Sequence, residues 1–228
     1  MADAQTASIK NADKKYDSYA YADAIKAYEK LVEKGVREER IFQRLGNSYY
    51  FIGELKEALK YYQELFSIND NQEADYLYKY AQCLKSEGNY AKADEILEKF
   101  SQKAPSDKRA VLFLKNRNYL EDIKSNSGRF DIADAGINSK DSDYGSTILD
   151  NKLVFTSARD TGSIIKKNFK WTNKAISTLY AVDLNPDGSI GKPMLFHKQN
   201  LQVNFNQSTP VFTKDGKTMY FTRNNSVD

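Results

Sequence analysis

Cysteine, histidine and tryptophan each occur once in this 228-residue sequence, and proline occurs four times. The single cysteine, Cys83, cannot form an intrachain disulfide, and nothing pairs it with a base, so we expect a packed thiol rather than a nucleophile. The single histidine, His197, has no thiolate or carboxylate beside it at zinc-binding spacing. The mean hydropathy is -0.70 and no long apolar run is present, which predicts that no helix crosses a membrane.

Catalytic and nucleotide-binding motifs are absent as well. The sequence contains no GxSxG elbow, Walker loop, HExxH motif or dinucleotide fingerprint. The formal charge of +3 is too small an excess to indicate nucleic acid. Pairs such as Asp141 and Asp143 are typical of turns, with a calcium site as the weaker alternative. We therefore expect no enzymatic activity, no cofactor, no metal ion and no nucleic acid.

One helical-hairpin pattern occurs three times in the first half of the chain. An alanine early in the second helix of each hairpin falls at Ala24, Ala58 and Ala93, at intervals of 34 and 35 residues. Each hairpin needs a small residue where its helices cross and bulky residues at helical spacing around it. Further small residues recur at matching positions, namely Gly46 and Ala81 within the first helices and Gly53 and Gly88 at their ends. In the first copy, Tyr19 stands where this turn glycine would fall.

The spacing and the small residues resemble the tetratricopeptide repeat (TPR). The resemblance implies an α-solenoid of three helical hairpins. A further helical stretch, from Asp107 to about Lys124, predicts a capping helix that covers the end of the last repeat. The alternative is an amphipathic helical core without registered repeats. We assign residues 1–126 to this domain.

The composition changes near Ser125. Short runs rich in Val, Phe, Tyr and Thr, bounded by Gly, Asn, Asp and Pro, then predict strands. These expected strands cover residues 130–133, 152–157, 177–184, 193–196, 209–212 and 218–222. Residues 185–188 and 214–217 are expected hairpin turns, because each contains a glycine that can supply a positive φ. Residues 127–228 are therefore predicted to be all β, and the whole chain is an α + β multidomain protein.

Two segments of the second half resemble each other: SDYGSTILDNKLVFTSARD, which begins at Ser142, and FNQSTPVFTKDGKTMYFTRNN, which begins at Phe205. Ile148 and Phe212 each end a short strand, and a polar turn follows. Residues 153–156 then correspond to residues 219–222. The second copy resembles the PD40 repeat of TolB-like, WD40-like β-propellers. The resemblance implies one four-stranded blade, with STLYAVDLNPDGSIGKPMLF as its outer hairpin, and part of a second, incomplete blade.

The order of TPR array, capping helix and PD40 segments resembles the OmpA-family envelope proteins of Bacteroidota, through phrases such as NSKDSDYGS, DNKLVFTSARDTG and LYAVDLNPDGSIGKP. The resemblance implies a periplasmic protein at the outer membrane. Some members are linked to type IX secretion and gliding motility, with an outer-membrane barrel of the PorP/SprF type as partner. In that family a C-terminal OmpA-like domain holds peptidoglycan. This sequence contains no such domain, and its opening MADAQTASIK lacks the apolar stretch of a secretory signal.

Candidate partner-binding residues follow from TPR geometry, in which the first helices line a concave groove. The groove positions carried onto this sequence are Tyr16, Asp17, Arg40, Gln43, Asn47, Tyr50, Phe51, Asp75, Tyr78, Gln82 and Lys85. The aromatic residues are the expected anchors for an extended peptide or a helix, and packing between helices is the alternative for each of them. A basic loop is a secondary candidate for contact with an acidic partner or lipid headgroups, against the alternative of a solvated loop: Lys166, Lys167, Phe169, Lys170, Trp171 and Lys174.

The sequence thus predicts a noncatalytic periplasmic scaffold that binds an outer-membrane barrel or a secretion component through the TPR groove and the propeller. One alternative is the regulatory propeller front of a hydrolase or peptidase whose catalytic domain lies outside this sequence. Another is an interaction fragment that completes its propeller by strand addition. Fold likeness alone does not decide among them.

Overall fold

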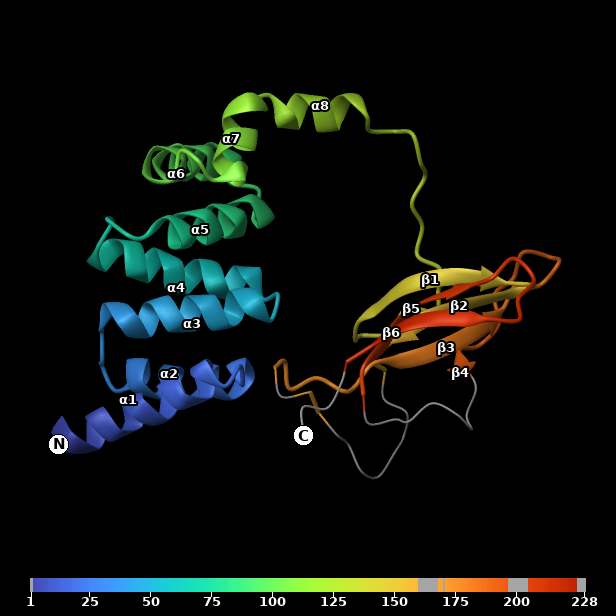
Figure 1. The fold of residues 1–228 in the computed structure, drawn as a ribbon, viewed down its shortest axis with the longest axis horizontal. Coiled ribbons are helices and arrows are strands. Elements are labelled where there is room, and N and C mark those ends of the chain that lie inside the picture. The colour runs from blue at the N-terminus through green and yellow to red at the C-terminus, as the bar shows by residue number, and fades with distance from the viewer. Residues whose placement is uncertain (1, 160–167, 170, 197–204, 225–228) are drawn as a thin grey trace. The chain divides into compact units, whose positions relative to one another are not determined.

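A computed structural model describes the chain except for residues 1, 160–167, 170, 197–204 and 225–228. The chain forms two compact units (Figure 1). The helical unit comprises residues 1–129 together with residues 170–172, and the strand unit comprises residues 130–169 and 173–228. Each unit is described separately below.

The helical unit contains eight helices within the described residues. They are α1 (Ala2–Asp17), α2 (Tyr21–Glu33), α3 (Glu39–Phe51), α4 (Leu55–Ile68), α5 (Ala74–Ser86), α6 (Tyr90–Lys103), α7 (Lys108–Lys115) and α8 (Tyr119–Ser125). Helices α1 to α6 pair in sequence as three hairpins that stack in chain order (Figure 1). The predicted hairpins are therefore confirmed.

Small residues let the paired helices approach closely. The three anchor residues Ala24, Ala58 and Ala93 are all fully buried. At Gly46 an added Cβ would lie 2.8 Å from the Cε1 atom of the Tyr62 ring, so only glycine fits beside this ring without a shift. One core cluster runs through all three hairpins and extends to Phe113 of α7.

The turn between the two helices of each hairpin uses one left-handed residue. These residues are Tyr19, Gly53 and Gly88, with φ angles of 58°, 84° and 76°. Glycine adopts this conformation without a Cβ clash, whereas tyrosine does so at a conformational cost. The turn of the first hairpin thus has the same left-handed backbone as the other two turns, but with tyrosine in place of glycine.

The predicted capping helix is wrong in one respect, because two short helices replace the single helix expected from Asp107 to Lys124. Helix α7 ends at Lys115, and α8 begins at Tyr119. Only Ala110 and Phe113 of this region are buried, while Leu112 and Ile123 are exposed. Residues 116–118 read Asn-Arg-Asn, and asparagine competes with helical backbone hydrogen bonding through its own amide. Too little apolar surface is buried here to overcome that break.

Within its described residues, the strand unit contains a four-stranded antiparallel sheet and a separate two-stranded sheet. The first sheet has the order β1 (Asp143–Leu149), β2 (Lys152–Ser157), β3 (Thr178–Asp183), β4 (Met194–Leu195), and the second pairs β5 (Gln207–Phe212) with β6 (Met219–Arg223). The expected turns are present, with positive φ at Gly188 and Gly216. The predicted strand at residues 130–133 is wrong, since these residues are irregular. Phe130 and Ile132 are almost fully exposed there, so no neighbouring strand covers their apolar side chains.

The two similar segments fold alike. Ile148 pairs with Leu153 in the first copy, as Phe212 pairs with Met219 in the second. Each pair of strands has a bulge at the matching place, where Gly145 and Thr209 have φ angles of 61° and 52°. The internal repeat read from the sequence is therefore a structural repeat.

The face of β5–β6 that carries Phe212 and Met219 packs on the first sheet. These two side chains lie against the core cluster of Val154, Leu179 and Phe196. A second cluster, formed by Phe155, Tyr180 and Val182, lies on the opposite face of the first sheet, because successive side chains of a strand alternate. The strand unit is thus at least two sheets deep.

Candidate functional site

The predicted groove residues belong to α1, α3 and α5, the first helices of the three hairpins. Three of them are exposed (Asp17, Arg40 and Asp75). Seven are partly buried: Tyr16, Gln43, Tyr50, Phe51, Tyr78, Gln82 and Lys85. Ten of the eleven therefore present some surface to solvent, and their role in binding stays a prediction.

The remaining groove residue, Asn47, is 5% exposed and joins three neighbouring side chains. Its amide donates to the Tyr16 hydroxyl at 3.1 Å, and its carbonyl oxygen accepts from the Tyr62 hydroxyl at 2.8 Å and from Lys79 Nζ at 3.0 Å. A buried amide with all these partners fixes the hairpins in register. Asn47 contributes to the face formed by the first helices α1, α3 and α5, because it holds Tyr16 and Lys79 in position.

The second and third hairpins each place a cation over an aromatic ring of the preceding first helix. The Arg44 guanidinium lies 4.7 Å from the ring centroid of Tyr16, and Lys79 Nζ lies 4.7 Å from that of Phe51. Arg109 of α7 continues the series over Tyr78, at 4.3 Å. The rings therefore gain cation–π contacts in addition to the area they bury.

These cations are also paired with carboxylates. Arg44 lies 2.9 Å from Asp17, and Lys79 lies 2.6 Å from Asp75. Asp13 accepts a hydrogen bond of 2.6 Å from the Tyr28 hydroxyl and pairs with Arg40 at 2.8 Å. The face carries mixed, locally balanced charge.

Three members of this network, namely Asp13, Arg44 and Lys79, were not predicted from the sequence. Arg44 and Lys79 are 35 residues apart, which is the repeat interval, so the recurrence of a cation at one repeat position was a usable signal. Asp13 had no such signal, because its partners come from α2 and α3.

Burial favours the neutral phenol of three tyrosines in this region. Burial raises the pKa of Tyr16 and that of Tyr50, and it raises the pKa of Tyr62 well above its ordinary value. Burial also lowers the pKa of Lys85, whose Nζ lies 4.1 Å from the ring centroid of Tyr119. Tyr16, Tyr50 and Tyr62 can therefore act as hydrogen-bonding aromatic contacts.

The basic loop is only partly described. Lys166, Lys167 and Lys170 lie outside the described residues. Asn168 and Ala175 form an antiparallel bridge, and the Phe169 amide donates to the Lys174 carbonyl at 2.9 Å. Trp171 belongs to the helical unit, where its ring contacts Tyr19 and Tyr21.

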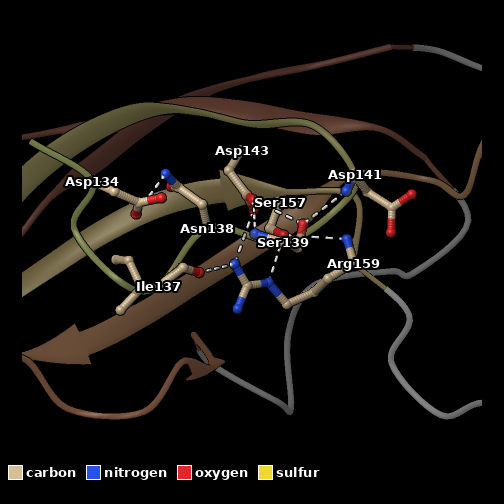
Figure 2. Close-up of polar contacts among 8 residues, drawn as sticks. All are labelled: Asp134, Ile137, Asn138, Ser139, Asp141, Asp143, Ser157 and Arg159. Atoms are coloured by element: carbon tan, nitrogen blue, oxygen red, sulfur yellow. Dashed lines mark hydrogen bonds and ion pairs between the residues drawn. The ribbon is translucent and has the colours of Figure 1, made fainter.

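A polar cluster fixes residues 134–143 to the first sheet of the strand unit (Figure 2). The Asp143 carboxylate accepts from the Ser139 amide at 2.5 Å and pairs with Arg159 at 2.9 Å. Arg159 also donates to the Ile137 carbonyl and to Ser157 Oγ. Burial alone would raise the pKa of Asp143, but the hydrogen bonds from Ser157, Ser139 and Arg159 hold it at about 2. This carboxylate is occupied in a structural ion pair.

Cys83 is fully buried in the helical core, as expected for a packed thiol, and burial raises its pKa to about 12. Among the described residues, no cluster of three or more His, Cys, Asp or Glu side chains is placed to hold a metal ion. None of the helices in the described parts of the chain is both long and apolar enough to span a bilayer.

Two tetratricopeptide-repeat family models match the chain, one over residues 39–72 and the other over residues 75–107. Similar solved structures include MamA, at 24% identity over 53% of this chain and 72% of that chain, with a TM-score of 0.43. Another is PcrH in complex with the chaperone-binding region of PopB, at 19% identity over 48% of this chain and 88% of that chain, with a TM-score of 0.40. A third is the type III secretion translocator chaperone SycD of Yersinia enterocolitica, at 23% identity over 56% of this chain and 97% of that chain, with a TM-score of 0.40.

The comparison with curated proteins gave no match. The family-model matches cover the second and third hairpins, and the first hairpin packs on them in the same way. The second and third hairpins are therefore tetratricopeptide repeats, and the first hairpin has the same helical arrangement.

Proposed function

We propose that this protein is a noncatalytic adaptor that binds a protein partner through the first helices of its tetratricopeptide repeats. The observation that carries the proposal is the match of two consecutive hairpins to tetratricopeptide-repeat models. Repeats of this kind stack into extended surfaces suited to protein ligands. The partly exposed rings of Tyr50 and Tyr78 are anchors on this surface, since aromatic side chains dominate binding energy in protein interfaces.

The charges on the first helices disfavour a partner that is bound by its terminal carboxylate. Arg44, Lys79 and Arg109 each lie within 4 Å of a carboxylate, so the face has no pair of uncompensated cations to grip a terminal carboxylate. Aromatic contacts and hydrogen bonds would instead hold an internal segment of the partner. An extended peptide or a helix fits this chemistry.

We place the adaptor in the periplasm at the outer membrane of a Bacteroidota cell. The resemblance to OmpA-family envelope proteins supports this location, and an outer-membrane barrel of the PorP/SprF type or a type IX secretion component is the partner we propose. Peptidoglycan binding would belong to an OmpA-like domain outside this sequence.

We further propose that the strand unit is the beginning of a PD40 β-propeller. Its first sheet is a four-stranded antiparallel meander, as a blade is, and its β5–β6 pair repeats β1–β2 in register. Val154 of β2 is fully buried beneath Phe212 and Met219, whereas its repeat counterpart Tyr220 is 66% exposed. A third sheet seated on Tyr220 and Val211 would cover this second copy as the second copy covers the first.

A pull-down from detergent-solubilised envelopes tests the adaptor function. The parent chain is compared with a Tyr50→Ala, Tyr78→Ala double variant. The matched control, Tyr49→Ala with Tyr90→Ala, removes two rings from positions outside the predicted groove, and circular dichroism establishes that all three chains are equally helical. We expect the parent and the control, but not the Tyr50→Ala, Tyr78→Ala variant, to recover an outer-membrane barrel or secretion component.

Two outcomes would contradict this proposal. Equal recovery by all three chains would move the binding site away from the first helices. Failure of the parent to recover any envelope protein would remove the support for an envelope adaptor.

A further inference from the structure

The turn of the first hairpin carries a residue that its backbone disfavours. Tyr19 occupies the left-handed position that Gly53 and Gly88 occupy in the next two hairpins. A Cβ in this conformation is crowded by the following carbonyl, so tyrosine is less stable there than glycine. The Tyr19 side chain is also 63% exposed, so burial in the core does not offset this cost. Strain of this kind is a signal of function when it is observed directly.

The Tyr19 ring takes part in an aromatic site that we define by Tyr19, Tyr21 and Phe51. Tyr21 lies 5.0 Å from Phe51 between ring centroids. The indole of Trp171 is stacked with Tyr19 at 6.2 Å and an interplanar angle of 11°, and it meets Tyr21 edge-on at 5.1 Å. Both geometries are favourable for aromatic pairs. The site therefore holds one indole against two tyrosines, whose rings also contact each other at 6.2 Å.

Two hydrogen bonds hold Trp171 at this site, one from its indole and one to its backbone carbonyl. Trp171 Nε1 donates to the Phe51 carbonyl at 3.0 Å, and the Ala22 amide donates to the Trp171 carbonyl at 3.3 Å. Phe51 is the last residue of α3 and Ala22 is in the first turn of α2, where helices leave backbone groups without intrahelical partners. Phenylalanine has no donor for the first bond, and the tyrosine hydroxyl is placed differently from the indole N–H. The site thus binds both the indole N–H and the backbone carbonyl of the tryptophan.

We propose that the aromatic site is a recognition site for a tryptophan on an extended protein segment, and that Trp171 is the ligand that the chain itself supplies. This proposal rests on the adaptor function in one respect, namely that the helical unit binds protein. It names the ligand class more closely. A partner segment that carries tryptophan competes with Trp171 for Tyr19, Tyr21 and the Phe51 carbonyl.

Because Trp171 is the only tryptophan, the test can use tryptophan fluorescence without background. The full chain carrying Trp171→Ala has no tryptophan, so a peptide with the sequence of residues 168–175, NFKWTNKA, becomes the only indole in the sample. We expect saturable binding with a blue shift of the peptide emission. The peptide NFKFTNKA should compete at least about tenfold more weakly, which corresponds to the loss of about one hydrogen bond.

Variants at the aromatic site complete the test. Adding Tyr21→Ala to the Trp171→Ala chain should abolish the blue shift. The control is Tyr90→Ala in the same background, which removes a tyrosine from the equivalent position of the third hairpin and should leave binding unchanged. Absence of saturable binding, or equal binding by the Tyr21→Ala and Tyr90→Ala chains, would overturn the proposal.

The parent chain gives an independent readout. Its emission should be blue-shifted and protected from acrylamide, and Tyr19→Gly should raise acrylamide quenching while helicity is retained. Unchanged quenching in Tyr19→Gly would also overturn the proposal. None of these measurements uses an envelope partner, so their failure is distinguishable from failure of the adaptor function.

Discussion

The helical unit and the strand unit are both built from repeats, but they bury their side chains to different extents. In the helical unit one core cluster runs through every hairpin, and it includes fully buried rings such as Phe42 and Tyr62. In the strand unit two clusters of three buried residues each lie on opposite faces of one sheet. A helical hairpin obtains its neighbours from the adjoining repeats of this chain, whereas a sheet needs a covering layer on each face.

This difference shows which apolar side chains of each unit are covered. The outer helices α7 and α8 end the helical array with little further burial. The second strand repeat leaves Val211 and Tyr220 exposed at positions that correspond to a covered face in the first repeat. We therefore expect the helical unit to be the more stable part of this chain.

The largest expected effect comes from matched leucines, Leu45 in the helical core and Leu179 in the strand core, both fully buried. Replacing a buried leucine by alanine removes apolar contacts and leaves a cavity, which costs about 2–5 kcal/mol. We expect Leu45→Ala to lower the free energy of unfolding by about 4 kcal/mol and Leu179→Ala by about 2 kcal/mol, because a shallower core relaxes more readily. A denaturant titration followed by circular dichroism measures the free energy of unfolding of the helical unit. Hydrogen exchange measures that of the strand unit. Equal losses would remove the distinction between the cores.

The second prediction compares two residues at one repeat position, Val154 and Tyr220. Val154→Ser should lower the stability of the strand unit by about 3 kcal/mol, because it removes buried methyl groups and buries a hydroxyl. Tyr220→Ser should change it by less than about 0.5 kcal/mol, since the ring is exposed. Hydrogen exchange of the β2 and β3 amides measures the stability of the strand unit in both variants. A large loss with Tyr220→Ser would mean that this side chain is already covered in the protein.

The third prediction concerns acid. The pKa of Asp143 is held at about 2, below its ordinary value of 3.8, so the folded state favours the carboxylate. The resulting stabilisation, about 2 kcal/mol, is complete above about pH 5 and is lost as the pH falls towards 2. Asp143→Asn should therefore lower strand-unit stability at pH 7 and flatten its pH dependence between pH 5 and 2. An unchanged acid dependence, measured by hydrogen exchange, would show that the ion pair with Arg159 does not contribute.

The smallest expected effect separates the first hairpin from the second. Tyr19→Gly relieves the left-handed strain but loses the ring contacts, so the helical unit should change in stability by less than about 1 kcal/mol. Gly53→Tyr introduces the same strain without those contacts and should cost about 1–2 kcal/mol. Thermal melts followed at 222 nm compare the two variants. If both changed stability equally, the two turns would be equivalent.

Much of the fold followed from spacing in the sequence. The positions of Ala24, Ala58 and Ala93 fixed the three hairpins, because a small residue is needed at each helix crossing. The pairing of Ile148 with Leu153, and of Phe212 with Met219, agrees with the internal repeat. The break between α7 and α8 did not, since it depends on how little of their surface is buried.

The candidate surface was predictable only in outline. TPR geometry placed ten residues where solvent reaches them, but it also selected Asn47, whose burial depends on partners from three different helices. The contacts of Trp171 had no signal in the sequence, because about 120 residues separate it from Phe51. Tyr19 did carry one, as the residue that interrupts a series of turn glycines.

The most direct test of the protein-binding surface is site-specific photocrosslinking in envelopes that contain the full-length protein. A photoreactive amino acid replaces Gln82, a partly buried residue of the predicted groove, and in a matched chain it replaces Lys60, an exposed residue on the second helix of its hairpin. We predict a crosslink to a discrete envelope protein from position 82 and none from position 60. Crosslinks of equal yield from both positions, or from position 60 alone, would contradict binding by the first helices.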